Sequence, residues 1–101
     1  MTKALFFDID GTLVSFKTHR IPLSTVEALR AAHDKGIKII ISTGRPMAFI
    51  TNLGALDGLI DGYITANGAY NFIGQTDVSC HCIDRQQAER IIRLSNEINV
   101  P

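Results

Sequence analysis

Several features that mark secreted, membrane-bound or nucleic-acid-binding proteins are scarce in this 101-residue sequence. Only two residues are cysteines, too few for a disulfide framework. Neither sign of charge prevails, because 10 lysines and arginines balance 10 acidic residues, which indicates neither nucleic acid nor a membrane as a partner. Apolar runs such as residues 4–7 fall far short of the roughly 18 residues of a membrane span, and the N-terminus does not resemble a signal peptide. We therefore expect a reduced, cytoplasmic protein.

The rest of the composition is that of a globular protein, with 46% apolar and 20% charged residues. A chain of this length has room for one small domain or for part of a larger one. Short apolar runs bounded by polar residues predict buried strands with both faces covered. These runs lie at residues 4–7, 37–42 and 59–65. A hairpin is expected from residues 69–73 and 76–83, because Gly74 and Gln75 separate two strand-like segments.

Helical patterns alternate with the predicted strands. The first covers residues 21–35, where Ser24 and Glu27 form a capping-box pattern. A shorter helix is expected over residues 46–53, and a last helix begins after Asp84. Strands that alternate with helices predict an α/β fold with right-handed crossovers, a parallel sheet and flanking helices.

Two aspartates stand where the first predicted strand ends, in the sequence FDIDGT at residues 7–12. If the backbone stays extended, Asp8 and Asp10 share one face, and Mg²⁺ would relieve the repulsion between their carboxylates. An aspartate beside a bound phosphate can act as a nucleophile, while its neighbour transfers protons. Gly11 lets backbone N–H groups approach phosphoryl oxygens. The alternative interpretation is an ordinary turn, but a chance D-x-D-G-T in a chain this long has a probability of about one in a thousand.

A second polar cluster, STGRP at residues 42–46, follows the second predicted strand. A hydroxyl and free N–H groups at a helix N-terminus form an anion site, to which Arg45 could add a bidentate contact. The alternative is an ordinary N-cap with a solvated arginine. Asn67 follows the third predicted strand. Because ligands of parallel sheets bind outside the carboxyl ends of the strands, Asp8, Thr43 and Asn67 are expected to converge.

The segments FFDIDGTL, IISTGRP and ITANGAY together resemble the haloacid dehalogenase superfamily. The resemblance is greatest to its Cof-type, type IIB sugar-phosphate phosphatases, and among these to the hexose-phosphate phosphatases. It implies a Rossmann-like core, a Mg²⁺ cofactor, and a small phosphorylated metabolite of the sugar-phosphate class as substrate. It further implies that Asp8 is the nucleophile and a metal ligand. By the same resemblance, Asp10 is the general acid/base and binds the metal through its backbone carbonyl, and Thr43 binds the phosphoryl group. The remaining residues that would line the site are Gly11, Gly44, Arg45 and Asn67.

Two elements of the family pattern have no counterpart in this sequence. None of its lysines follows the second cluster, and no Gly-Asp motif follows Asn67. We therefore expect residues 1–77 to be the N-terminal part of the core and residues 78–101 to be the start of a truncated α/β cap of the C2 type. A phosphatase that lacks both elements is expected to hydrolyse its substrate weakly or not at all. The alternative function is a non-catalytic module that binds phosphate or a partner, and the oligomeric state is open.

One further cluster, Cys80-His81-Cys82, has the residue types of a metal site. On a strand, the two cysteines face one way and the histidine the other, and no fourth ligand is near in sequence. We interpret the cysteines as packing residues of a strand in the cap.

Overall fold

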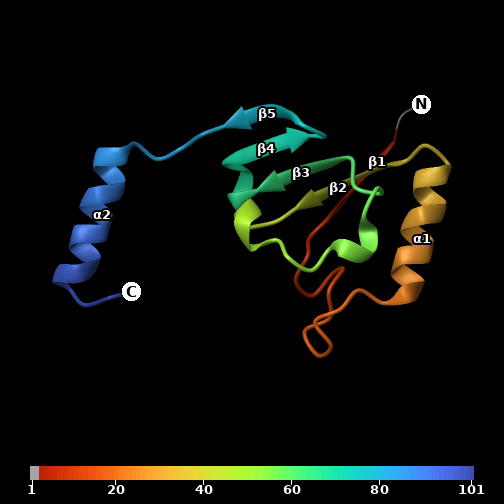
Figure 1. The fold of residues 1–101 in the computed structure, drawn as a ribbon, viewed down its shortest axis with the longest axis horizontal. Helices are drawn as coiled ribbons and strands as arrows, with labels where there is room; N and C mark the ends of the chain where they lie inside the picture. Colours follow the sequence, from red (N-terminus) through yellow and green to blue (C-terminus); the bar gives the residue numbers. More distant parts are fainter. Residues whose placement is uncertain (1–2) are drawn as a thin grey trace.

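The computed structural model describes residues 3–101 and has an α/β fold built on one five-stranded sheet (Figure 1). Among these residues, no helix is both long and apolar enough to cross a membrane. The elements in chain order are β1 (Ala4–Phe7), α1 (Leu23–Asp34), β2 (Lys38–Ser42), η1 (Met47–Phe49), η2 (Gly54–Leu56), β3 (Gly62–Thr65), η3 (Ala66–Gly68), β4 (Tyr70–Ile73), β5 (Thr76–Cys80) and α2 (Arg85–Glu97).

The sheet is mixed, and its strands follow one another in sequence order. β1, β2 and β3 are parallel, whereas β4 and β5 add an antiparallel hairpin beside β3. Phe7 pairs with Ile41, and Ser42 pairs with Ile64, so the three parallel strands end side by side. The expected α/β class and the hairpin are confirmed.

The first helix begins and ends differently from its predicted capping pattern. α1 starts at Leu23 with Pro22 as its N-cap, and no side chain caps it. Ser24 therefore lies inside the helix, and the predicted capping box is wrong: the Pro22 carbonyl accepts the first helical N–H bonds instead. At the other end, Gly36 takes a left-handed φ of 83°, and its N–H bonds to the carbonyl of His33. This turn leads directly into β2.

The predicted helix over residues 46–53 is wrong. Only two short 3₁₀ turns form in this region, η1 and η2, and Ile50 between them has an extended backbone. Ile50 and Thr51 are β-branched and Asn52 competes for backbone hydrogen bonds, so the segment favours a helix weakly. Burial of apolar side chains favours the irregular backbone, because in this conformation Leu53 and Leu56 reach the core.

The apolar core lies on one face of the sheet only. Ile39 and Ile41 of β2 are fully buried there, beside Val26 and Leu29 of α1. On the opposite face, the side chain of Phe6 is 62% exposed. The expectation that β1 is covered on both faces is therefore wrong, since among residues 3–101 no helix lies over that second face (Figure 1).

The last helix stands apart from the sheet (Figure 1). Its N-cap is Asp84, as predicted, whose carboxylate accepts a hydrogen bond from the N–H of Gln86 at 3.2 Å. Its apolar side chains are exposed, among them Ile91 at 58% and Ile92 at 61%. The proposed domain division at residue 78 falls inside β5, and this division stays a prediction.

A glycine in the sheet supplies a test of its packing. A Cβ atom on Gly62 would lie 3.1 Å from Cδ1 of Ile40, 3.2 Å from the carbonyl oxygen of Phe72 and 3.3 Å from Cγ1 of Ile73. Gly62→Ala is expected to lower the free energy of unfolding by about 1–3 kcal/mol, because the backbone oxygen cannot move aside freely. Urea denaturation measures the change. Gly54→Ala is the matched control, since nothing lies within 4 Å of its Cβ position; equal midpoints for both variants would contradict the prediction.

Candidate active site

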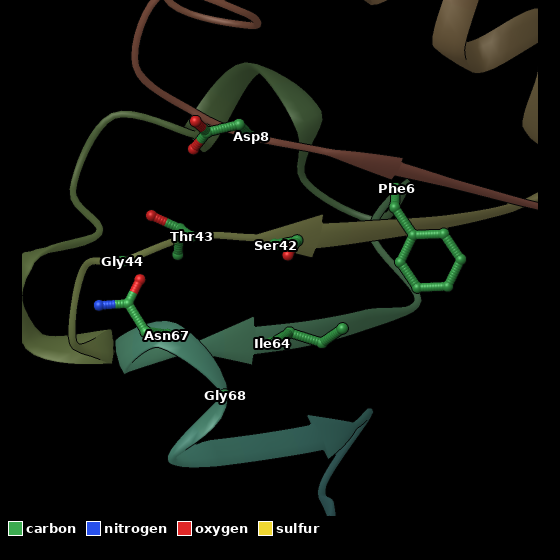
Figure 2. A pocket seen from close by; sticks show the side chains of 8 residues that line it. All are labelled: Phe6, Asp8, Ser42, Thr43, Gly44, Ile64, Asn67 and Gly68. Atoms are coloured by element: carbon green, nitrogen blue, oxygen red, sulfur yellow. The ribbon is translucent and has the colours of Figure 1, made fainter.

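A pocket of about 590 Å³ opens where the three parallel strands end (Figure 2). Asp8 follows β1, Thr43 follows β2 and Asn67 lies in η3 directly after β3. Figure 2 shows the three side chains pointing to the same side of the pocket. The other lining residues are Phe6, Ser42, Gly44, Ile64 and Gly68. The predicted convergence of Asp8, Thr43 and Asn67 on one sheet edge is confirmed.

Asp8 is held in place by the turn that follows it. Its Oδ1 accepts a hydrogen bond from the N–H of Ile9 at 2.7 Å. Ile9 is fully buried, and its carbonyl accepts from the N–H groups of Leu13 and Val14 at 3.1 and 2.9 Å. The residue beside the carboxylate is thus anchored in the core. Oδ2 of Asp8 accepts no hydrogen bond within residues 3–101, so it is the oxygen that can meet a ligand.

Thr43 presents a buried hydroxyl to the pocket, with only 5% of the residue exposed. Its N–H extends the β2–β3 pairing by donating to the carbonyl of Ile64 at 2.9 Å. Its Oγ1 accepts from the N–H of Arg45 at 3.0 Å. Because the oxygen is used as an acceptor, the hydroxyl hydrogen can be donated to an anion in the pocket.

Asn67 is placed by an unusual stretch of backbone. Ala66, Asn67 and Gly68 all have left-handed φ values, of 49°, 54° and 94°. Such a conformation is unfavourable for alanine and is found mostly where a site requires it. The N–H of Asn67 donates to the carbonyl of Thr43 at 3.2 Å, and its Oδ1 lies 3.0 Å from where a Cβ of Gly44 would stand. Gly44 is needed here because a side chain would push the carboxamide aside.

Asp10 and Arg45 are paired with each other outside this pocket. The guanidinium donates through Nε and Nη2 to the two Asp10 oxygens at 2.9 and 2.5 Å, and through Nη1 to the Phe49 carbonyl at 3.0 Å. The hydrogen bond with Asp10 raises the pKa of Arg45. Neither residue lines the pocket. The backbone leaves its extended course at Ile9, which explains why the two carboxylates do not face one space.

Gly11 is also placed outside the pocket. It has a left-handed φ of 76°, and a Cβ there would lie 2.5 Å from Cε2 of Phe16. It lines a neighbouring hollow together with Phe16. The glycine is required by the turn after β1, whereas a direct contact with phosphate stays a prediction.

The pocket has the donors for part of a magnesium shell. Mg²⁺ is bound in proteins through one or two carboxylates, with waters and substrate phosphate completing an octahedron. Asp8 supplies one such carboxylate, so the donor set fits. Within residues 3–101, no three His, Cys, Asp or Glu side chains converge on one point. No lysine or arginine is among the lining residues either, so the pocket offers no cationic side chain to a phosphate.

Two features of the site were not anticipated from the sequence. Ser42 lines the pocket beside Thr43, and its position in the STGRP cluster could have indicated this. The Asp10–Arg45 pair was missed as well. The sequence does contain an indication of this pair. Asp10 and Arg45 have opposite charges and follow neighbouring parallel strands, so they lie at the same edge of the sheet.

Comparisons with known proteins find similar sequences. Residues 5–101 match a family model described as haloacid dehalogenase-like hydrolase. A phosphoglycolate phosphatase of Pyrobaculum neutrophilum is 34% identical over 98 residues, covering 95% of this chain and 42% of that protein. The phosphatase YwpJ of Bacillus subtilis is 37% identical over 67 residues, covering 66% of this chain and 23% of that protein.

Solved structures extend the similarity to the fold. A chain from a crystallographic study of a trigonal-bipyramidal intermediate in a phosphoryl-transfer superfamily is 55% identical, with a TM-score of 0.89 over 98% of this chain and 39% of that one. A sugar phosphatase of HAD subclass IIB is 57% identical, with a TM-score of 0.85 over 94% of this chain and 37% of that one. The chain thus spans less than half the length of these relatives.

Proposed function

The chain belongs to the haloacid dehalogenase-like hydrolases, and from this membership and the pocket geometry we propose that it functions in Mg²⁺-dependent hydrolysis of phosphomonoesters. The proposed substrates are small phosphorylated metabolites of the sugar-phosphate class, an assignment supported by the 57% identity to a subclass IIB sugar phosphatase. The observation that carries the proposal is the convergence of Asp8, Thr43 and Asn67 in one pocket.

In the first step, Oδ2 of Asp8 attacks the phosphorus atom, and the bond from phosphorus to the alcohol oxygen breaks. The leaving oxygen takes a proton from Asp10, which enters this step in its protonated form and recovers a proton from water in the second step. Asp10 is 42% exposed at its side chain, so it can turn from Arg45 toward the leaving group. Thr43 donates its hydroxyl hydrogen to a phosphoryl oxygen, and the Asn67 carboxamide stands beside it.

In the second step, water attacks the aspartyl-phosphate and gives its proton to Asp10. Inorganic phosphate leaves and the Asp8 carboxylate is restored. Asp8 and the backbone carbonyl of Asp10 would hold Mg²⁺, which would supply positive charge to offset that of the phosphoryl group. Acid–base assistance of the kind assigned to Asp10 contributes about 10²–10⁴ in rate.

The 101-residue chain itself is expected to turn over slowly. No cationic side chain lines its pocket, and each missing group that stabilises developing charge lowers kcat by about 10²–10³. With p-nitrophenyl phosphate and Mg²⁺, we expect kcat below about 1 s⁻¹, the low end for enzymes. The rate of phosphate release, measured over a series of magnesium concentrations, gives this kcat. Addition of a chelator is expected to abolish the release. Turnover of ordinary enzymatic speed would contradict the prediction.

A second candidate function is binding of a partner without catalysis. The observation that favours it is the uncovered sheet face, where Phe6 and Val78 are each 62% exposed and Ile73 is 58% exposed. Exposed apolar patches of this kind mark interaction sites. The two functions are separated by the magnesium series, because a module that only binds a partner would release no phosphate from an ester at any magnesium concentration.

A further inference from the structure

The two cysteines lie together on the surface. Their sulfur atoms are 3.2 Å apart, close enough for one thiol to donate a hydrogen bond to the other. Both residues are exposed and free. The interpretation of Cys80 and Cys82 as packing residues is therefore wrong, since neither side chain enters the core.

Their place in the fold allows the sulfur atoms to come closer. Cys80 is the last residue of β5, and Cys82 lies in the irregular segment 81–84 that leads to α2. Residues two apart on an extended chain have Cα atoms about 6.6 Å apart, which falls within the roughly 4.4–6.8 Å range that a disulfide spans. Cys82 has no strand pairing that would hold it, so a small bend at His81 can close the remaining gap.

We infer that Cys80 and Cys82 form a redox-active dithiol, which a low-molecular-weight disulfide such as glutathione disulfide converts into an intramolecular disulfide. The thiolate of Cys82 attacks one sulfur of glutathione disulfide and displaces a glutathione thiolate, which takes up a proton. Cys80 then gives up its proton, attacks Sγ of Cys82 and displaces the second glutathione. Two electrons and two protons pass from the dithiol to the external disulfide, which becomes two thiols.

The order of the two cysteines follows from their surroundings. The hydrogen bond to Cys82 raises the pKa of Cys80, and the nearby Asp77 adds to this. A raised pKa leaves less of Cys80 as the reactive thiolate, so Cys80 is assigned the second step, the attack that closes the ring.

Oxidation acts at the junction between the sheet and α2. The N–H of His81 donates to the carbonyl of Ala69 at 2.7 Å, one step beyond the last pairing of β5. Closing the disulfide bends the backbone at this residue and weakens that bond. This segment connects the sheet to α2 (Figure 1), so its course is expected to differ between the reduced and the oxidised chain.

The test uses the whole chain and a series of glutathione redox buffers, with acid quenching, alkylation by N-ethylmaleimide and intact mass measurement. The reduced chain is expected to take two alkyl groups. The oxidised chain is expected to take none, to have lost two hydrogen atoms, and to run as a monomer on a non-reducing gel. Stable glutathione adducts or disulfide-linked dimers in place of this species would overturn the inference.

Variants and unfolding show whether the fold brings the pair together. Cys80→Ser and Cys82→Ser each leave one thiol and are expected to stop at a mixed disulfide with glutathione; both sites are exposed, so the fold tolerates them. In concentrated urea, the equilibrium constant for forming the Cys80–Cys82 disulfide is expected to fall about tenfold. This corresponds to a change of ~30 mV in the reduction potential of this two-electron couple. An equal constant in folded and unfolded chains would show that the fold adds nothing to the reactivity of the pair and would refute the proposal.

Discussion

Asp8→Asn is expected to lower phosphomonoester hydrolysis by about 10³-fold or more, the order of loss that follows removal of a nucleophile. The change replaces an attacking oxygen by an amide nitrogen and removes a negative charge from the magnesium site. Asparagine keeps an oxygen that can accept the hydrogen bond from the N–H of Ile9, which is 2.7 Å long in the native chain. The fold should therefore survive, and the loss can be assigned to chemistry.

Because turnover of the chain is expected to be slow, the decisive measurement is of the intermediate. The chain is mixed with p-nitrophenyl phosphate and Mg²⁺, quenched in acid and digested, and the peptide that carries a phosphoryl group is identified by mass spectrometry. The native chain should be modified on Asp8, and Asp8→Asn should carry no adduct. Asp57→Asn is the matched control, because it makes the same chemical change at an exposed residue outside the pocket. A phosphoryl group on another residue, or equal hydrolysis by Asp8→Asn, would exclude the proposed nucleophile.

The positions of the three strand ends could be predicted from the sequence, because each end is marked by residues next to it in the chain. Buried parallel strands are short apolar runs, and the polar residue that ends each run marks the carboxyl edge of the sheet. Asp8, Thr43 and Asn67 each stand at such a boundary, so their convergence follows from strand direction alone. The turn residues Gly36 and Gly74 were likewise predictable, because left-handed backbone favours glycine.

The arrangement of Asp10 and Arg45 could not be predicted in the same way. Whether two carboxylates two residues apart share a face depends on where the strand stops, and strand ends are the least reliable part of a sequence interpretation. Here the carbonyl of Ile9 accepts hydrogen bonds from three N–H groups, those of residues 12–14, and this turn begins between the two aspartates. The guanidinium then takes Asp10 as its partner, a contact between residues 35 positions apart. Such a contact becomes visible only once the strands are placed.

The region after β3 shows a second limit. The amphipathic pattern of residues 85–97 predicts a helix, and α2 confirms it, but the pattern cannot say what its apolar face contacts. In the described residues that face is exposed, as is the face of the sheet opposite the core, on which Phe6 lies. The proposed start of a cap at residue 78 rests on family resemblance, and β5 continues through that residue as part of the same sheet.

Thr43→Val is the substitution with the second largest expected effect. Valine has the shape of threonine but cannot donate a hydrogen bond to a phosphoryl oxygen, and removal of one such donor costs about 10²–10³ in kcat. It also removes the acceptor for the N–H of Arg45, 3.0 Å away in the native chain. The expected result is a loss of that size in kcat/KM for p-nitrophenyl phosphate, together with weaker binding of inorganic phosphate. Thr43→Ser keeps the hydroxyl and should retain most of the activity.

Thr65→Val separates this catalytic effect from a structural one. Thr65 is as deeply buried as Thr43, and its hydroxyl donates to the carbonyl of Tyr70 at 2.7 Å, but it does not line the pocket. Its replacement should lower the free energy of unfolding by about 1 kcal/mol, the net value of one hydrogen bond, and leave kcat/KM near that of the native chain. If both valine variants lost activity in proportion to stability, the Thr43 hydroxyl would serve the fold and not the phosphate. Thr43 follows β2, and Thr65 ends the neighbouring parallel strand β3. Because the two residues are placed so similarly, only a difference in activity between their valine variants can assign the hydroxyl of Thr43 to the reaction.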